Sequence, residues 1–131
     1  MTAKVHDAAQ QGFSREAGTY VRGRPDYPAP LLGWLQDTLA LGPGRSVLDV
    51  GAGTGKFTAL LARTGAAVTA VEPVDAMRAQ LQAALPAVQA VAATADAVPL
   101  PDASADAIVC AQAFHWFASE AALREFHRLL R

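Results

Sequence analysis

Residues 47–57 of this chain read Val47-Leu48-Asp49-Val50-Gly51-Ala52-Gly53-Thr54-Gly55-Lys56-Phe57. The apolar start predicts a buried strand that ends beside an acidic residue, and three glycines then occupy every second position. Glycine adopts positive φ angles at little cost and lets a flat ligand lie directly against the backbone. The helix predicted to follow offers unpaired N–H groups in its first turn. This stretch therefore predicts a nucleotide-binding turn between a strand and a helix.

Two other nucleotide-binding loops are built from glycines, and neither fits this turn. A P-loop would require glycine at position 50 and a hydroxyl residue at position 57, where the chain has Val50 and Phe57. The dinucleotide fingerprint would require a third glycine where the chain has Lys56. The sequence thus argues against a P-loop, and it disfavours a site for NAD or FAD.

Helical and strand-like segments alternate along the rest of the chain. Helices are expected at about 29–41, 56–63, 75–85 and 119–130, and short apolar strands at 46–50, 67–71, 88–92 and 107–111. This alternation predicts an α/β fold, with a Rossmann-like, doubly wound and mainly parallel sheet that carries helices on both faces. Ligands of such sheets bind beyond the carboxyl ends of the strands. The candidate site should therefore lie at those ends.

The last predicted helix begins after Ser119, whose hydroxyl can cap the helix start. Leu123, Phe126 and Leu130 follow at helical spacing and are expected to form the buried stripe of this helix. The earlier helices have equivalent apolar stripes, which contain Leu31, Leu35 and Leu39; Phe57, Leu60 and Leu61; and Met77, Leu81 and Leu85.

The Asp-x-Gly-x-Gly-x-Gly pattern of the turn resembles that of the class I S-adenosylmethionine (SAM) dependent methyltransferases, especially those with a type 11 methyltransferase domain. SAM contains no phosphate, so its binding turn does not need the close pyrophosphate approach of a dinucleotide site. The resemblance implies SAM as the cofactor, with Asp49 holding the loop and facing the methionine ammonium group. It also implies that the methionine part of SAM lies on the backbone of small residues, namely Gly51, Ala52, Gly53 and Gly55.

Residues at the ends of the next two predicted strands match the same family. Glu72 and Pro73 close the second strand, and the resemblance implies that the Glu72 carboxylate accepts hydrogen bonds from the ribose diol. Met77 is either an adenine-contacting residue or an ordinary packing residue of the next helix. Asp96 and Ala97 follow the third strand, and by resemblance Asp96 accepts from the adenine amino group while the Ala97 backbone meets the ring. Aspartate is also favoured in turns, which leaves a purely local role for Asp96 open.

The segment after the fourth predicted strand should lie where methyl donor and acceptor meet. Ala111, with which the fourth predicted strand ends, is small and leaves room at the reacting centre. His115 is a candidate general base, because an imidazole titrates near neutral pH, and it is equally a candidate polar core residue. Trp116 and Phe117 are expected either to pack in the core or to form a substrate wall.

An irregular segment near the amino terminus, rich in glycine and proline, also resembles the family, in which the corresponding segment folds over the cofactor. The resemblance implies that Arg24 pairs with the SAM carboxylate, which suits a planar guanidinium. It also implies that Tyr20 covers the site through its ring and hydroxyl. A basic surface segment without a ligand remains the alternative.

The composition limits the partners and the location of the protein. The 131 residues suffice for one domain, with 13–131 forming the SAM-binding domain after a flexible stretch at 1–12. A net charge of −1 and scattered basic residues argue against a nucleic-acid partner. A single cysteine rules out an intrachain disulfide, no Cys/His/Asp group has metal-ligand spacing, and no apolar run suits a bilayer or a secretion signal. We therefore expect a cytoplasmic protein without a metal, nucleic-acid or membrane partner.

The resemblance extends over about residues 13–131 but reaches only the first part of the family's domain. The sheet is therefore expected to be truncated after its fourth strand and the following helix, and an exposed sheet edge there would favour homo-oligomers. The expected function is in-line methyl transfer from SAM to a small-molecule acceptor. A non-catalytic or incomplete SAM-binding module and, less favoured, a dinucleotide-binding oxidoreductase domain remain alternatives.

Overall fold

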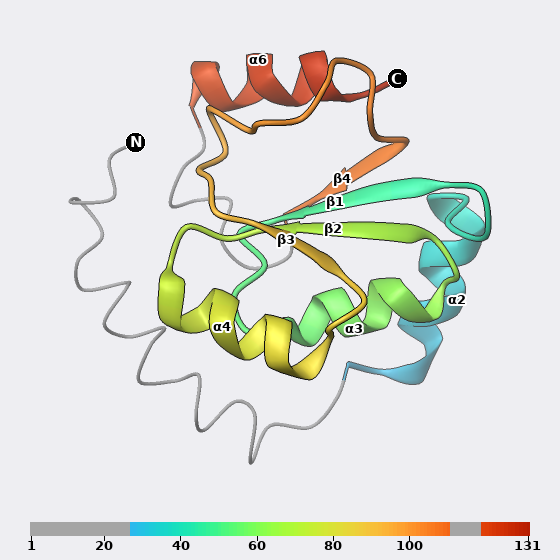
Figure 1. Ribbon diagram of the computed structural model, residues 1–131. Coiled ribbons are helices and arrows are strands. Elements are labelled where there is room, and N and C mark those ends of the chain that lie inside the picture. Colours follow the sequence, from blue (N-terminus) through green and yellow to red (C-terminus); the bar gives the residue numbers. More distant parts are fainter. Residues whose placement is uncertain (1–26, 111–118) are drawn as a thin grey trace.

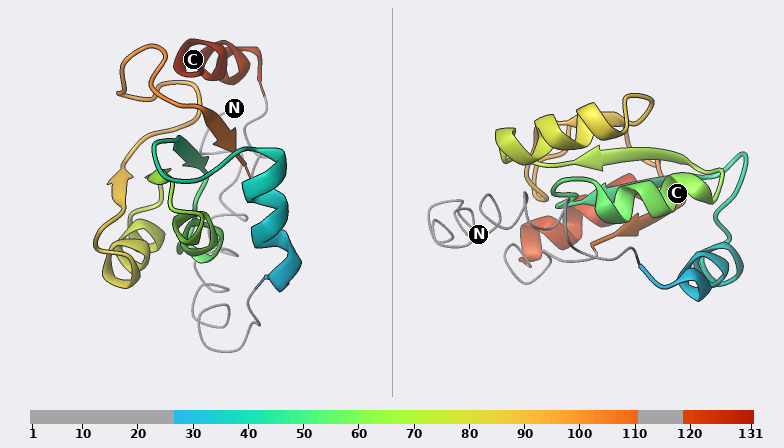
Figure 2. Two further views of the ribbon diagram at one scale, coloured as in Figure 1. Left: turned by 90° about the vertical axis from the view of Figure 1, so that its right-hand side faces the viewer. Right: turned by 90° about the horizontal axis from the view of Figure 1, so that it is seen from below.

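The computed structural model describes residues 27–110 and 119–131. It has a central sheet with helices on both faces (Figure 1). In chain order the elements are α2 (Ala29–Thr38), β1 (Ser46–Val50), α3 (Lys56–Arg63), β2 (Ala67–Val71), α4 (Asp75–Ala84), β3 (Gln89–Val91), β4 (Ala107–Val109) and α6 (Glu120–Leu129). The sheet has four strands in the order β3-β2-β1-β4, and every pairing is parallel. Helices α2, α3 and α4 lie on one face and α6 lies on the other (Figure 1, Figure 2). The predicted Rossmann-like α/β fold is thus confirmed.

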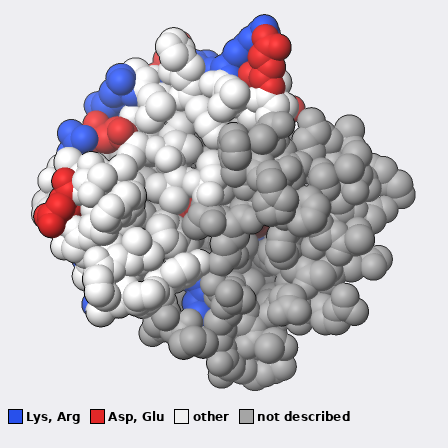
Figure 3. All heavy atoms as spheres, turned by 180° about the vertical axis from the view of Figure 1, so that it is seen from behind, with Lys and Arg blue, Asp and Glu red and all other residues white. Residues whose placement is uncertain are grey.

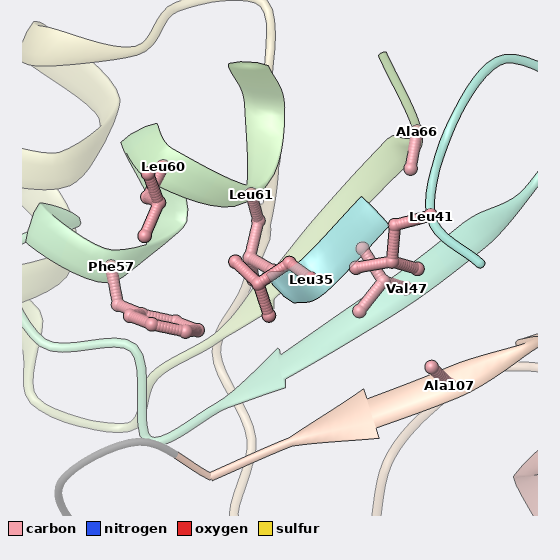
Figure 4. Close-up of a cluster of buried hydrophobic side chains, with 8 residues drawn as sticks. All are labelled: Leu35, Leu41, Val47, Phe57, Leu60, Leu61, Ala66 and Ala107. Atoms are coloured by element: carbon pink, nitrogen blue, oxygen red, sulfur yellow. The ribbon is translucent and has the colours of Figure 1, made fainter. Parts of the chain in front are cut away.

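Two apolar clusters attach the helices to the sheet. On one face, Leu35 of α2 and Leu61 of α3 pack in a cluster with Val47 of β1 (Figure 4). On the other face, Leu48 of β1 packs in a cluster with Leu129 of α6. Neighbouring residues of β1 therefore point to opposite faces, as the two-residue period of a strand requires. Burial of each such side chain stabilises the fold by roughly 1.5–3 kcal/mol.

The register of the strands brings their carboxyl ends to one edge of the sheet. Val50, the last residue of β1, pairs with Val71 of β2, and Val71 pairs with Val91 at the end of β3. Val109 at the end of β4 pairs with Asp49. Because the strands are parallel, the loops that follow them leave the sheet at this same edge. Most of the described candidate residues therefore lie near one another.

The predicted elements at 46–50, 56–63 and 67–71 have the observed boundaries, whereas the others are shorter than expected. Helix α2 ends at Thr38 instead of near residue 41. Ala40 takes a positive φ of 54°, which an α-helix cannot continue. Strand β3 contains only the residues that pair with β2.

The predicted buried stripe of α6 is wrong. Leu123 and Leu130 are 55% and 38% exposed, whereas Ala122 and Leu129 are fully buried. The helix is therefore turned by one residue, about 100°, from the expected orientation. Backbone contacts explain this rotation, because the carbonyl of Leu129 accepts a 2.9 Å hydrogen bond from the N–H of Ala105. The small side chain of Ala122 also lets the helix approach the sheet closely.

Other expectations for the helices are confirmed. The Oγ of Ser119 accepts a hydrogen bond from the N–H of Ala122 at 3.1 Å, so this serine caps α6. Phe126 is partly buried against the cluster beneath α6. Met77 and Leu81 of α4 are buried as predicted.

The described surface carries charges of both signs. Seen from behind, its acidic and basic side chains lie mainly toward the margin of the view (Figure 3). Across residues 27–110 and 119–131, no helix combines the length and apolarity needed to span a membrane. In those same ranges, no group of three or more His, Cys, Asp or Glu side chains could hold a metal ion. The predicted domain boundary between residues 12 and 13 lies outside the described residues.

Candidate functional site

The glycine turn crosses the end of the neighbouring strand. The N–H groups of Gly51 and Ala52 both donate to the carbonyl of Val71, at 2.8 and 3.2 Å. Gly53 has a φ of 64°, in the left-handed region that favours glycine. The turn is thus held against the carboxyl end of β2 by its own backbone.

Gly55 must be glycine for two reasons. It is the N-cap of α3 and has a φ of 94°. A Cβ atom at this position would also lie 2.9 Å from Cγ of Leu81, a buried residue of α4. The close approach of the turn to α4 therefore depends on the missing side chain.

Glu72 fastens the turn through its carboxylate. Its Oε1 accepts from the N–H of Gly53 and its Oε2 accepts from the N–H of Val74, both at 2.8 Å. The side chain is buried, and burial raises the pKa of Glu72 above its usual value, although the bonds from Val74 and Gly53 and the nearby charge of Arg78 lower it. Each carboxylate oxygen has a second lone pair. Glu72 can therefore hold the turn and still accept hydrogen bonds from a ligand.

Asp49 is a second buried acid at this edge. It is 1% exposed, and its Oδ2 accepts a 2.7 Å hydrogen bond from the hydroxyl of Thr58 on α3. Burial raises the pKa of Asp49 to about 7; the bond from Thr58 lowers it and the negative charge of Glu72 raises it. Two buried carboxyl groups with raised pKa values thus lie beneath the glycine turn, and perturbed pKa values are frequent at functional sites.

Met77 packs directly against the turn. Its side chain is 6% exposed, and its Sδ lies 4.0 Å from the position that a Cβ on Gly53 would occupy. The expected packing of Met77 is confirmed, and its contact with adenine stays a prediction. Pro73 is exposed immediately after Glu72.

Asp96 and Ala97 are exposed in the turn after β3. The Thr94 hydroxyl donates to Asp96 Oδ1 at 2.6 Å, and the N–H of Ala97 donates to the carbonyl of Thr94 at 3.2 Å. Thr94 and Ala97 also form an isolated antiparallel bridge. The Asp96 carboxylate therefore has a local role in the turn and keeps exposed acceptor positions for a ligand.

Comparison with known proteins places the chain in a family. The family model described as "Methyltransferase domain" matches residues 48–131, from the middle of β1 through α6. The chain belongs to this family. An uncharacterized methyltransferase of Mycobacterium tuberculosis is 45% identical to this methyltransferase domain over 119 residues, which are 91% of this chain and 47% of that protein. The chain thus spans about half the length of that curated relative.

Solved structures support the fold of the methyltransferase domain. A sugar N-methyltransferase from Streptoalloteichus is 27% identical, with a TM-score of 0.72 over 88% of this chain and 49% of that chain. A SAM-dependent methyltransferase from Aquifex aeolicus is 24% identical, with a TM-score of 0.69 over 81% of this chain and 63% of that chain. At this low identity the second match shows the fold alone. The resemblance noted in the sequence is confirmed.

Six of the residues singled out in the sequence are not placed by the structure. Outside the described residues lie Tyr20, Arg24, Ala111, His115, Trp116 and Phe117. The described members of the predicted site, from Asp49 to Ala97, lie at or after the carboxyl ends of β1, β2 and β3 in the methyltransferase domain.

Thr58 and Cys110 are neighbours of the acid pair that the sequence did not predict. Thr58 is a polar residue on the buried face of α3 between Phe57 and Leu61, and a polar side chain in such a position needs a buried partner. Cys110, which directly follows β4, is half-buried. Burial raises the pKa of its thiol to about 12, and the negative charge of Asp49 adds to this effect.

Proposed function

We propose that this methyltransferase domain binds SAM and transfers its methyl group to a small-molecule acceptor. The observation that carries the proposal is the pair of buried acids, Asp49 and Glu72, beneath a turn of small residues. SAM carries a positive sulfonium and a positive ammonium group, which such acids attract. A dinucleotide would bring a negative pyrophosphate instead, and Lys56 stands where its fingerprint needs glycine.

In the proposed complex, the parts of SAM follow the strand ends in order. The methionine part lies on the backbone from Gly51 to Gly55, with the charge of Asp49 beneath its ammonium group. The ribose diol donates to Glu72, whose oxygens have lone pairs beyond those used by Gly53 and Val74. The adenine amino group donates to Asp96, which is exposed beside Ala97. Tyr20 and Arg24 are proposed to cover the cofactor from the amino-terminal segment.

The chemistry of the proposed reaction requires mainly positioning. The acceptor atom forms a bond to the methyl carbon as the carbon–sulfur bond breaks, and the sulfur keeps the electron pair of that bond. Alignment of donor and acceptor can supply about 7–11 kcal/mol at best. A carboxylate acceptor needs no base, whereas a neutral hydroxyl or amine must lose a proton, which we assign to His115 in that case.

SAM binding and turnover are separate properties of this chain. It spans 47% of the length of its relative from Mycobacterium tuberculosis, whereas its described residues already supply the three acids that the proposed cofactor contacts require. Because these acids support SAM binding by themselves, a second candidate function is that the chain binds SAM without methylating an acceptor. A transfer assay with SAM labelled in the methyl group and a panel of carboxylic acid, hydroxyl and amine acceptors separates the two functions.

Calorimetry with SAM, S-adenosylhomocysteine and NADH tests the cofactor. We expect both adenosyl compounds to bind and NADH to bind weakly or not at all. The variant Glu72→Gln should weaken SAM binding by about tenfold or more, since a carboxamide has one acceptor oxygen instead of two. The matched control Glu120→Gln changes an exposed glutamate of α6 and should leave SAM binding unaltered. NADH binding more tightly than SAM would overturn the proposal.

A further inference from the structure

An ion pair on α6 holds the loop that follows β3. The guanidinium of Arg128 donates through Nε to Glu125 Oε1 at 2.7 Å and through Nη2 to Glu125 Oε2 at 2.8 Å. It also donates to the carbonyls of Val98 and Leu100, at 2.9 and 2.7 Å, and to Asp102 at 2.8 Å. Helix α6 thereby holds three residues that lie 26 to 30 positions earlier in the chain.

Val98 is held by this pair at both of its backbone groups. Its N–H donates to Glu125 Oε2 at 2.7 Å, while its carbonyl accepts from Arg128. Hydrogen bonds to charged partners are stronger than those between neutral groups, and the two-pronged contact fixes the direction of the guanidinium. The backbone at Val98 therefore has little freedom to turn.

The clamped residue adjoins the exposed turn. Ala95 and Val98 are both 3% exposed and pack in the cluster that contains Leu129 of α6. Asp96 and Ala97 lie between these two anchors and are exposed. Helix α6 thus fixes the position of Asp96 through the apolar contacts of Ala95 and Val98 and through the ion pair.

We propose that the Glu125–Arg128 pair is a positioning element that sets how the chain recognises the base of its cofactor; the inference rests on the proposed SAM function. The pair touches no proposed ligand atom. It acts through Val98 on the adjacent Asp96–Ala97 turn, where, under the proposed function, Asp96 accepts a hydrogen bond from the amino group of adenine. A ligand without that amino group gains little from the correct position of Asp96, so the pair should affect selectivity for the base.

The charges and the exposure of the pair agree with this role. The bond from Arg128 lowers the pKa of Glu125, so the carboxylate is ionised at neutral pH. The side chains of Arg128 and Glu125 are 32% and 14% exposed. Partly exposed ion pairs contribute little to the free energy of unfolding. The hydrogen bonds from this pair to the backbone of Val98 and Leu100, in contrast, fix the position of the loop that follows β3.

The test compares two ligands that differ at the base. S-adenosylhomocysteine has the amino group, and its deaminated form, S-inosylhomocysteine, has a carbonyl oxygen there. Dissociation constants are measured by calorimetry for the unaltered chain and for Arg128→Lys and Glu125→Gln. The matched control is Arg124→Lys, because Arg124 forms an exposed ion pair with Glu120 on the same helix. Thermal unfolding shows whether each variant is folded.

We expect the unaltered chain to prefer the adenine compound. Arg128→Lys and Glu125→Gln should weaken its binding about tenfold while changing binding of the inosine compound much less, so that the preference shrinks. Arg124→Lys should change neither constant. Equal weakening of both ligands, or an unchanged preference in a folded variant, would overturn the inference and leave the proposed function intact. Failure of the unaltered chain to bind S-adenosylhomocysteine would overturn both.

Discussion

The hydroxyl of Thr58 donates a 2.7 Å hydrogen bond to Oδ2 of Asp49, and both residues are at most 1% exposed. This bond joins the first turn of α3 to the end of β1, on either side of the glycine turn. Burial raises the pKa of Asp49 to about 7 and the Thr58 bond opposes that rise. The Thr58 donor therefore favours the charged form of Asp49 against the effect of burial.

The nearly isosteric variant Thr58→Val should make SAM binding more dependent on pH. Without the donor, the pKa of Asp49 rises further, so the carboxyl is protonated at neutral pH and its attraction for the ammonium group of SAM is lost. Calorimetry between about pH 6 and pH 9 should show weaker binding at neutral pH that recovers as pH rises. Thr58→Ser retains a hydroxyl and should behave like the unaltered chain. Identical pH profiles for the valine and serine variants would contradict this role.

The raised pKa of Asp49 also predicts how stability changes with pH. The ordinary pKa is 3.8 and the folded-state pKa is about 7, so between these values the folded chain keeps a proton that the unfolded chain releases. Stability should therefore fall as pH rises through this window, by at most about 1.4 kcal/mol per pH unit from this group.

Urea unfolding of the unaltered chain and of Asp49→Asn, at several pH values within that window, measures the effect. Glu72 contributes in the same direction because its pKa is also raised. The difference between the two chains isolates Asp49, since both contain Glu72. Parallel stability curves for the two chains would show that Asp49 does not titrate in this way.

A pair of glycine substitutions should separate backbone strain from side-chain collision. Gly44 and Gly55 have φ values of 86° and 94°, but only Gly55 has a close neighbour, since Cγ of Leu81 lies 2.9 Å from the position that its Cβ would occupy. Gly44→Ala should cost about 1–2 kcal/mol of unfolding free energy from conformation alone. Gly55→Ala should cost about 1–3 kcal/mol more, because Leu81 or the turn must move. Equal decreases of the unfolding free energy in the two variants, measured by urea unfolding, would show that α4 moves away from the new Cβ without loss of stability.

Two serine substitutions should have opposite effects on stability. Ser119→Ala removes the acceptor for the N–H of Ala122 and should destabilise the fold by about 0.5–2 kcal/mol, whereas Ser119→Asp retains a cap. Ser104 Oγ is buried and has no hydrogen-bond partner within the part of the chain that the structure describes. Ser104→Ala should therefore be neutral or stabilising by up to about 1 kcal/mol. Thermal unfolding of the three variants checks both expectations.

Local signals in the sequence were sufficient for the centre of the fold. The glycines before and after α3 mark its ends, and apolar runs mark β1 and β2. The lengths of β3 and β4 depend on pairing with their neighbours, which the sequence does not display. The rotation of α6 depends on helix-to-sheet distance, because a small Ala122 is buried where the more apolar Leu123 is exposed.

The candidate site was predictable to the extent that it follows from parallel strands. Acids placed at the ends of successive strands, such as Asp49 within β1 and Glu72 just after β2, must meet at one edge when the strands run in the same direction. Contacts between residues far apart in the chain could not be predicted in this way. Arg128 reaches Val98 across 30 residues, and no spacing in the sequence relates an arginine in a helix to the carbonyl of a distant loop.

Cys110 offers an experimental use for its unusual surroundings. A thiol with a pKa of about 12 is almost entirely protonated at neutral pH, and protonated thiols react slowly with alkylating reagents. The chain contains a single cysteine, so any fast alkylation reports exposure at the end of β4. The rate at which Cys110 is alkylated in the unmodified protein, with and without ligand, therefore measures how often the structure opens locally at the end of β4.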